Sequence, residues 1–266
     1  MGKIVAVHSF RGGTGKSNIV ANTAACIAGK GKNVGIVDTD IQSPGIHVLF
    51  GFVPESIGKS LNDYLWGECS IEEAAYDVTN RLAGVADAGG KVHLIPSSMR
   101  MGEITRILKE GYEISILNDG FTGIINALNL DYLFADTHPG LGEETLLSLA
   151  ISDISLIILR PDKQDYQGTS VTLEVCKQLE VPNLFLVINK VLPTYDCEKV
   201  KRDVESVYKC EVAGVLPLSE DLVETGSSEI FYPTHREHIF SVGIEEIADR
   251  IIESRFSPVS WLDRAD

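Results

Sequence analysis

The chain has 266 residues, of which 44% are hydrophobic, and it carries a formal net charge of −15. This acidic balance disfavours a general affinity for nucleic acid or for anionic membranes, while leaving room for a local basic patch. No apolar run approaches the ~20 residues that cross a bilayer, and the first residues lack the basic and apolar regions of a secretory signal. We therefore expect a cytoplasmic protein with a well-packed core.

The cysteines are scattered along the chain, and no two of them form a C-x-x-C or C-x-C pair. They are Cys26, Cys69, Cys176, Cys197 and Cys210. An odd, dispersed set is typical of reduced thiols rather than of a disulfide framework or a metal site. We expect all five to be small buried side chains.

Apolar runs and helical patterns alternate along the chain, without an internal repeat or a linker. The predicted strands are 3–8, 33–38, 92–96, 131–136, 154–160, 183–189 and 212–216. The predicted helices are 16–30, 58–66, 70–77, 115–128, 142–151, 167–179, 197–209 and 243–255. Glycines between 78 and 91 predict a turn.

This alternation predicts one α/β domain over residues 1–266. The expected architecture is a doubly wound, mostly parallel sheet with helices on both faces. Such folds bind ligands beyond the carboxyl ends of their strands. Loops 9–17, 38–45, 136–144 and 189–195 are therefore expected to form the site.

Residues 9–17 read Ser-Phe-Arg-Gly-Gly-Thr-Gly-Lys-Ser, between an apolar run and a helical pattern. Three glycines allow a backbone whose N–H groups point inward and bind anions. The following helix presents its positive N-terminal end to the same loop. Lys16 can reach the β- and γ-phosphates, and Ser17 can coordinate Mg²⁺. The motif predicts a phosphate-binding loop for a nucleoside triphosphate.

Two carboxylates follow the predicted strand 33–38, in the sequence Asp38-Thr39-Asp40. One can hold a Mg²⁺-bound water, and the other can orient the attacking water. Acidic residues at such a position also cap helices. Beside a phosphate-binding loop we favour the magnesium and water roles.

A further apolar run ends in Asp136, which is the Walker B arrangement for holding Mg²⁺ through water. Gly140 and Gly142 give the next loop the freedom that a segment sensing the γ-phosphate needs. His138 lies in this loop. It could touch the γ-phosphate or a partner chain, but we favour a packing role.

Asn189-Lys190 ends the predicted strand 183–189. An amide that both donates and accepts hydrogen bonds suits the edge of a purine base. Residues 215–219 follow the next strand and can supply the other wall of a base pocket, through Pro217.

These four motifs, in this order, resemble the deviant Walker ATPases of the MinD/ParA family, and the resemblance covers nearly the whole chain. It also includes segments 60–67, 92–98 and 214–217. The resemblance implies that ATP and Mg²⁺ bind and that two subunits sandwich two ATP molecules face to face. The residues it assigns to nucleotide binding are Arg11, Gly12, Gly13, Thr14, Gly15, Lys16, Ser17, Asn18, Asn189 and Pro217. To catalysis it assigns Lys16, Asp40 and Arg11, and to the metal Ser17, Asp38, Asp40 and Asp136.

Arg11 stands where the family has its signature lysine, which reaches across to the partner subunit's phosphates. Arginine keeps the charge but carries it on a longer, planar, multi-donor group. It could act in trans, like an arginine finger, or fold away from the phosphates. We expect a phosphate-contacting role, because the charge stands beside three correctly placed glycines.

Relatives with metal clusters need cysteines close to Asp136 or in a close pair, and no cysteine follows Asp136 until Cys176. We therefore expect no metal cluster. Membrane-cycling relatives end in a basic amphipathic helix, whereas the helical pattern at 243–255 is acidic and is expected to pack on the domain. The apolar segment 256–262 could dock onto a partner or fray.

The leading interpretation is an ATP-gated homodimer whose slow, partner-stimulated hydrolysis positions or regulates an unknown protein partner or cargo, as in cell division or partitioning. DNA is disfavoured as a partner by the net charge. The alternative is a metabolic ATP-dependent ligase or synthetase of the same fold that acts on a small molecule. A nucleotide-binding adaptor without hydrolysis is opposed by Asp38, Asp40 and Asp136.

Overall fold

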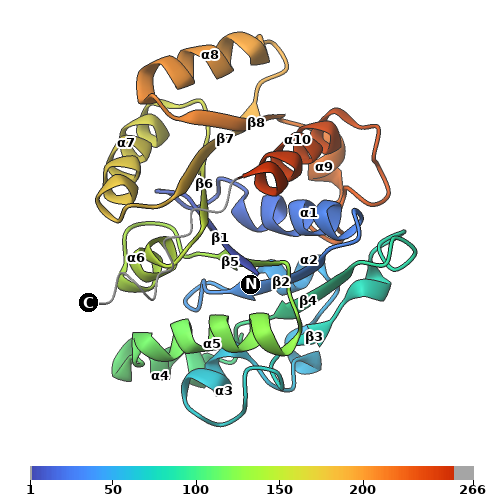
Figure 1. Cartoon of the computed structure of the whole chain (residues 1–266), viewed down its shortest axis with the longest axis vertical. Helices are drawn as coiled ribbons and strands as arrows, with labels where there is room; N and C mark the ends of the chain where they lie inside the picture. Colours follow the sequence, from blue (N-terminus) through green and yellow to red (C-terminus); the bar gives the residue numbers. More distant parts are fainter. Residues whose placement is uncertain (1, 255–266) are drawn as a thin grey trace.

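The computed structural model describes residues 2–254, which fold around an eight-stranded sheet (Figure 1). The strand order is β3-β4-β2-β5-β1-β6-β7-β8, and neighbours run parallel except for β3, which is antiparallel to β4. The strands are β1 (Lys3–His8), β2 (Asn33–Asp38), β3 (Tyr76–Asp77), β4 (Lys91–Ile95), β5 (Tyr132–Asp136), β6 (Ile154–Leu159), β7 (Asn183–Val191) and β8 (Glu211–Pro217). The predicted doubly wound, mostly parallel sheet is confirmed.

Helices cover both faces of this sheet (Figure 1). They are α1 (Lys16–Ala28), α2 (Ile46–Leu49), α3 (Leu61–Leu65), α4 (Met101–Glu110), α5 (Ile114–Ala127), α6 (Glu143–Ala150), α7 (Lys163–Gln178), α8 (Cys197–Tyr208), α9 (Glu220–Glu224) and α10 (Ile239–Glu253), with short 3₁₀ turns at Pro54–Ser56 and Thr79–Arg81. In β1, Val5 and Val7 pack in one core with α1 and α10, whereas Ile4 and Ala6 face the cores beneath α3–α8. Burial on both faces explains the uninterrupted apolar runs of the central strands.

Helix α1 lies deep in this arrangement, with 11 of its 13 residues buried. The exceptions are Ser17 and Asn18, in its first turn, which are half-exposed. A helix buried on all sides needs no polar face, so beyond its first turn the sequence is mostly small and apolar, with Asn22 and Thr23 as buried polar residues. The helix that carries the predicted phosphate-binding lysine is therefore fixed within the core.

The predicted helix 70–77 is wrong. Ser70 and Glu73 do exchange the two hydrogen bonds of a helix-starting box, Ser70 N to Glu73 Oε2 and Glu73 N to Ser70 Oγ. The chain then makes only turns before entering β3. The Tyr76 hydroxyl accepts from the backbone N–H groups of Gly58 and Lys59, both at 2.9 Å, so a tertiary contact overrides the local signal.

Other differences lie at helix boundaries and in short helices. Helices α2 and α9 are single turns, too short to give a periodic pattern. Helix α4 has the periodicity of an amphipathic helix, but the sequence analysis did not predict it. Helix α10 begins four residues before the predicted start, because His238 Nδ1 accepts from Phe240 N at 3.0 Å. The end of that predicted helix, residue 255, and the segment 256–262 lie outside the described residues.

The cysteines are all free thiols. Cys26 and Cys176 are buried as expected, but Cys69, Cys197 and Cys210 are only half-buried, so the expectation of full burial is wrong for these three.

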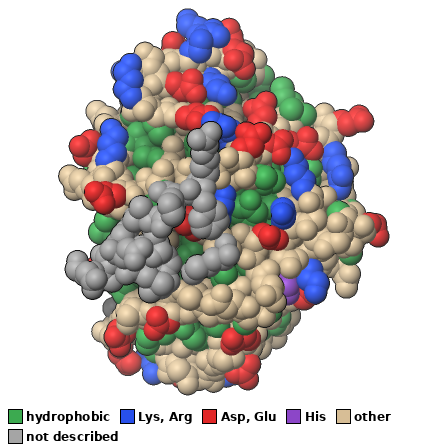
Figure 2. Space-filling view, viewed as in Figure 1, with side chains coloured by type: hydrophobic (Ala, Val, Ile, Leu, Met, Phe, Trp, Pro, Cys, Tyr) green, Lys and Arg blue, Asp and Glu red, His purple; other side chains and the backbone are tan. Residues whose placement is uncertain are grey.

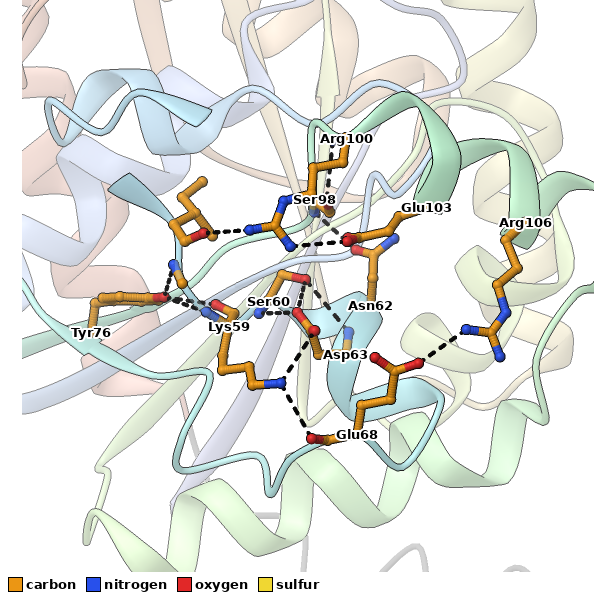
Figure 3. A network of polar contacts seen from close by, with 12 residues as sticks. Lys59, Ser60, Asn62, Asp63, Glu68, Tyr76, Ser98, Arg100, Glu103 and Arg106 are labelled. Carbon is orange, nitrogen blue, oxygen red and sulfur yellow. Dashed lines mark hydrogen bonds and ion pairs between the residues drawn. The ribbon is translucent and has the colours of Figure 1, made fainter. Parts of the chain in front are cut away.

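A polar network fixes helix α3 to the loop that follows β4 (Figure 3). Asp63 Oδ2 accepts from the N–H and hydroxyl of Ser60, which starts the helix. Asn62 Oδ1 accepts from Ser98 N at 2.9 Å. The preceding residue, Ser97, donates its hydroxyl to the carbonyl of Asp38 at 2.7 Å. The network therefore supports the end of β2, where a predicted site residue lies.

Gly90 marks the point where the chain entering β4 passes closest to the end of α1. A Cβ atom here would lie 1.9 Å from the Ala28 carbonyl oxygen and 2.9 Å from that of Lys32. Both obstacles are backbone atoms, so neither can move aside cheaply.

We expect Gly90→Ala to lower the free energy of unfolding by about 2 kcal/mol, because overpacking must displace backbone. Gly102→Ala in α4 is the matched control, since nothing lies within 4 Å of its Cβ position, and it should be neutral or slightly stabilising. Urea unfolding curves measure both. Equal effects of the two substitutions would contradict the close approach at Gly90.

Candidate nucleotide-binding site

The loop between β1 and α1 wraps around the N-terminal end of α1. Gly13 and Gly15 have φ angles of 75° and 94°, a region that suits glycine. Helix α1 begins at Lys16, whose exposed fraction is only 8%. The lysine charge and the positive end of the helix dipole thus lie together at one end of the loop. This is the arrangement that binds phosphate at a helix N-terminus.

The end of β7 braces this loop from the side. Asn189 Nδ2 donates to the Thr14 carbonyl at 2.7 Å, and Lys190 Nζ donates to the Gly13 carbonyl at 2.9 Å. A Cβ at Gly15 would lie 2.5 Å from Asn189 Nδ2, so the brace requires glycine there. Asn189 and Lys190 therefore hold the carbonyl groups outward and leave the N–H groups of the loop for an anion.

A cavity of about 260 Å³ lies next to this brace. The predicted nucleotide-binding residues Asn18, Asn189 and Pro217 all line it. Leu218 and Ser219, from the predicted wall 215–219, also line it, whereas sequence reasoning missed the part of the wall that comes from the segment 222–227 and from Phe240 in α10. Asn189 Oδ1 accepts from Lys190 N at 2.8 Å, and its amide keeps one N–H and one lone pair for a ligand.

Two acidic side chains lie side by side at the carboxyl ends of β2 and β5. Asp38 and Asp136 are directly paired in the sheet register and are 0% and 2% exposed. Burial, together with the charges of Asp136 and Asp40, raises the pKa of Asp38 well above its ordinary value. Burial likewise raises the pKa of Asp136 to about 6, although Ser17 and Lys16 oppose this. The pair is an electrostatic site for a cation.

The oxygen atoms at this point fit Mg²⁺. Within residues 2–254, Asp136 Oδ1 is buried without a hydrogen-bond partner, and the nearby Ser17 side chain acts to lower the pKa of Asp136, against the larger effect of burial. Carboxylate and hydroxyl oxygens are the ligands that Mg²⁺ takes, with the remainder supplied by water and phosphate. Over the same residues, no group of three or more His, Cys, Asp or Glu side chains could hold a metal ion, so an ion at the two aspartates would need the Ser17 hydroxyl, water and phosphate as further ligands.

Asp40 lies two residues after Asp38, in the loop that leaves β2. Its Oδ1 accepts from Ser43 N at 3.1 Å and lies 2.6 Å from Nδ1 of His138. The structure thus brings His138, in the loop after β5, against the carboxylate that the sequence selects for orienting water. The favoured packing role for His138 omitted this contact, because no spacing rule joins residues 98 positions apart.

Arg11 lies on the outer side of the phosphate-binding loop. Its guanidinium is 3.4 Å from Asp165 Oδ1 and 3.7 Å from Asp162 Oδ1, at the N-terminal end of α7, and 39% of the side chain is exposed. Arg160 binds the same two carboxylates. Although burial acts in the opposite direction, the bonds from Arg160 lower the pKa of Asp165, which stays ionised. The preceding residue, Phe10, rests on Gly168 of α7, where a Cβ would lie 2.2 Å from its ring.

His8, at the end of β1, is a buried residue that sequence reasoning missed. Its Nδ1 lies 2.8 Å from the hydroxyl of Thr137, which donates to the Val7 carbonyl. Burial lowers the pKa of His8 to about 3, with a further contribution from the nearby Lys16. The ring is therefore neutral and joins the strand before the phosphate-binding loop to the loop after β5.

Residues 2–188 match the protein family described as AAA domain. The chain belongs to this family. The match includes β1, the phosphate-binding loop, both buried aspartates and β7 as far as residue 188, so it ends just before Asn189, Lys190 and the cavity wall that follows them.

Several curated proteins are similar over most of the chain. The flagellum site-determining protein YlxH of Helicobacter pylori is 25% identical over 94% of this chain and 82% of its own length. An uncharacterised ATP-binding protein of Methanocaldococcus jannaschii is 25% identical over 80% of this chain and 73% of its own. The iron-sulfur cluster carrier protein of Pyrococcus abyssi is 26% identical over 70% of this chain, which spans only 60% of that relative.

Solved structures show the same fold. The MinC:MinD cell division complex of Aquifex aeolicus matches with a TM-score of 0.75 at 21% identity, over 96% of this chain and 97% of that one. MinD of Pyrococcus horikoshii with Mg-ADP gives a TM-score of 0.77 at 16% identity, over 95% and 97%. Cobyrinic acid a,c-diamide synthase of Mycobacterium smegmatis with ADP and magnesium gives 0.70 at 20%, over 95% and 94%. With the family match, these findings confirm the MinD/ParA resemblance.

We expect Asp136→Asn to raise the thermal midpoint of the nucleotide-free, magnesium-free protein by a few degrees, because it removes one of two buried like charges. The same change should weaken the binding of Mg²⁺ with nucleotide. The matched control is Asp87→Asn on an exposed turn, which should change neither. A thermal midpoint lowered by Asp136→Asn would show that the carboxylate stabilises the empty site, against our electrostatic argument.

Proposed function

We propose that this chain is an ATP-binding and ATP-hydrolysing dimerisation switch of the MinD/ParA type, made of a single cytoplasmic domain over residues 1–266. In this proposal, ATP joins two subunits face to face, and slow hydrolysis, stimulated by a partner, separates them. The observation that carries the proposal is the direction of the Arg11 side chain, which leaves its own phosphate-binding loop and contacts Asp162 and Asp165.

The phosphate-binding loop supports the nucleotide-binding part of the proposal. Gly12, Gly13, Thr14 and Gly15 would present N–H groups to the phosphates, and Lys16 would bind the β- and γ-phosphates. The 260 Å³ cavity would receive the base, between Asn18, Asn189 and Pro217. The MinD of Pyrococcus horikoshii, which has the same fold, holds Mg-ADP.

The buried carboxylates support the hydrolytic part. Ser17, Asp38 and Asp136 would hold Mg²⁺, with Asp40 close by, and the ion would neutralise negative charge on the phosphates. Asp40 would orient the attacking water through its carboxylate. Lys16 would stabilise the charge that develops on the transferred phosphoryl group.

The position of the Arg11 side chain supports the dimerisation part of the proposal. Its guanidinium is exposed on the face of the loop and paired with Asp162 and Asp165. The pair with Asp162 is exposed and contributes little to stability, and the buried Asp165 would keep Arg160 as a partner. A phosphate presented by a facing subunit could therefore take Arg11 as a bidentate partner. The planar fork of arginine suits that contact, which the MinD/ParA resemblance assigns to a lysine.

The proposed partner is a protein. On the face shown in Figure 2, the described basic side chains lie among acidic ones, and the net charge of −15 opposes binding to DNA. The relative YlxH is a flagellum site-determining protein, and MinD of Aquifex aeolicus occurs in a complex with MinC. Within residues 2–254, no helix combines the length and apolar character required to span a membrane.

Light scattering tests the switch directly. We expect a monomer with Mg·ADP and a dimer with Mg·ATP, and the dimer should persist longer in Asp40→Ala, which lacks the water-orienting carboxylate. Lys16→Ala is the control that should bind ATP poorly and remain monomeric. A mass unchanged by ATP, in a chain that demonstrably binds it, would overturn the dimer and favour an enzyme acting on a small molecule.

Arg11→Ala tests the contact in trans. We expect it to weaken ATP-dependent dimerisation by about 10-fold or more, the loss typical of one charge-assisted contact, while the monomer keeps its nucleotide affinity. Arg160→Ala, which removes the other arginine bound to Asp165, is the matched control for disturbance of α7. Equal losses of nucleotide affinity and dimerisation in Arg11→Ala would place this arginine in its own subunit's site.

A further inference from the structure

Asp40 is held by hydrogen-bond donors from two different loops. Ser43 N–H, in the loop after β2, donates to Oδ1 at 3.1 Å. His138 Nδ1, in the loop after β5, lies 2.6 Å from the same oxygen. A carboxylate oxygen that takes an N–H bond is an acceptor, so Nδ1 of His138 must carry the hydrogen. Both donors use Oδ1, which leaves Oδ2 for another group.

The backbone around His138 is fixed on the phosphate-binding loop. Gly140 N donates to the Ser9 carbonyl at 3.3 Å, and the Thr145 hydroxyl donates to the His138 carbonyl at 3.1 Å. Pro139 lies over Gly12, where a Cβ would be 3.8 Å from its ring. The imidazole therefore reaches Asp40 from a loop that rests directly on the predicted phosphate site.

His138 and Asp40 are both partly exposed, as residues that act in hydrolysis must be. The side chains of His138 and Asp40 are 31% and 16% exposed, so solvent and ligand can reach both. The neighbouring Asp38 and Asp136, in contrast, are fully enclosed at the proposed metal position. The acidic residues therefore differ in their surroundings. Asp38 and Asp136 are buried at the proposed cation position, whereas Asp40 is partly exposed and is held by His138.

We propose that His138 is a positioning residue for hydrolysis. It fixes Asp40 through Oδ1, so that Oδ2 points to the attacking water, and it ties the loop after β2 to the loop after β5. This inference rests on the proposed ATPase function. It gives His138 a role through Asp40 and not through contact with the phosphates.

The kinetic test compares the parent chain with three single-substitution variants. We expect His138→Ala to lower kcat about 10-fold, the size typical of losing a partner that orients a reactive group, with KM for Mg·ATP changed less than about 3-fold. His138→Asn places an N–H donor where Nδ1 stands, and it should restore kcat to within about 3-fold of the parent. His235→Ala, in the loop before α10, is the control and should leave kcat unchanged.

A double-substitution cycle separates positioning from an independent role. We expect His138→Ala to lower kcat no further when Asp40 is already alanine. A second, equal loss in the Asp40→Ala background would overturn the inference, as would failure of His138→Asn to restore activity while the protein stays folded.

A spectroscopic test does not depend on hydrolysis. In ¹⁵N-labelled protein at alkaline pH, the imidazole of His138 should show its hydrogen on Nδ1, and Asp40→Ala should abolish this preference. A hydrogen on Nε2 in the parent protein would overturn the inference. If no ATP is hydrolysed by any variant, the proposed function fails, while the tautomer still decides whether Asp40 and His138 are paired.

Discussion

The burial of Asp38 and Asp136 next to each other is the constraint on which the rest of the site depends. Two carboxylates in direct register at the ends of β2 and β5 repel each other and are deprived of water. A fold keeps such a pair only where positive charge is supplied, and here Lys16 and the N-terminal end of α1 lie beside it. In the proposed function a divalent cation would relieve the remaining negative charge, and charge balance at this point would then couple metal, nucleotide and fold.

The second constraint is backbone direction in the phosphate-binding loop. Glycine freedom alone permits many conformations, and freedom without support would not present N–H groups to an anion. The side chains of Asn189 and Lys190 donate hydrogen bonds to the carbonyls of Thr14 and Gly13. The N–H groups on the opposite side of the loop therefore point inward. A residue pair chosen from the sequence for base recognition is thus also a scaffold for the phosphates.

Sequence reasoning predicted the fold well, because the central strands are buried on both faces and read as uninterrupted apolar runs. It failed where a tertiary contact decided local structure, as when the Tyr76 hydroxyl drew residues 76–77 into a strand. The sequence selected the residues of the phosphate-binding loop and the aspartates at strand ends as site candidates, because each set belongs to a contiguous motif. Asp165, His8 and the partner of His138 were not selected, because these contacts join segments distant in sequence and follow only from the packing of loops on the sheet edge.

The deep burial of α1 has a consequence for the life of the protein in a cell. Its first turn is the proposed phosphate site and its remainder is part of the core, so a ligand held at Lys16 would stabilise the whole fold and not only a loop. By mass action, a ligand at 100 times its dissociation constant adds about 2.7 kcal/mol to the free energy of unfolding. Proteases and chaperones act on unfolded chains, so under the proposed function the molecules without bound nucleotide would be the first to be degraded.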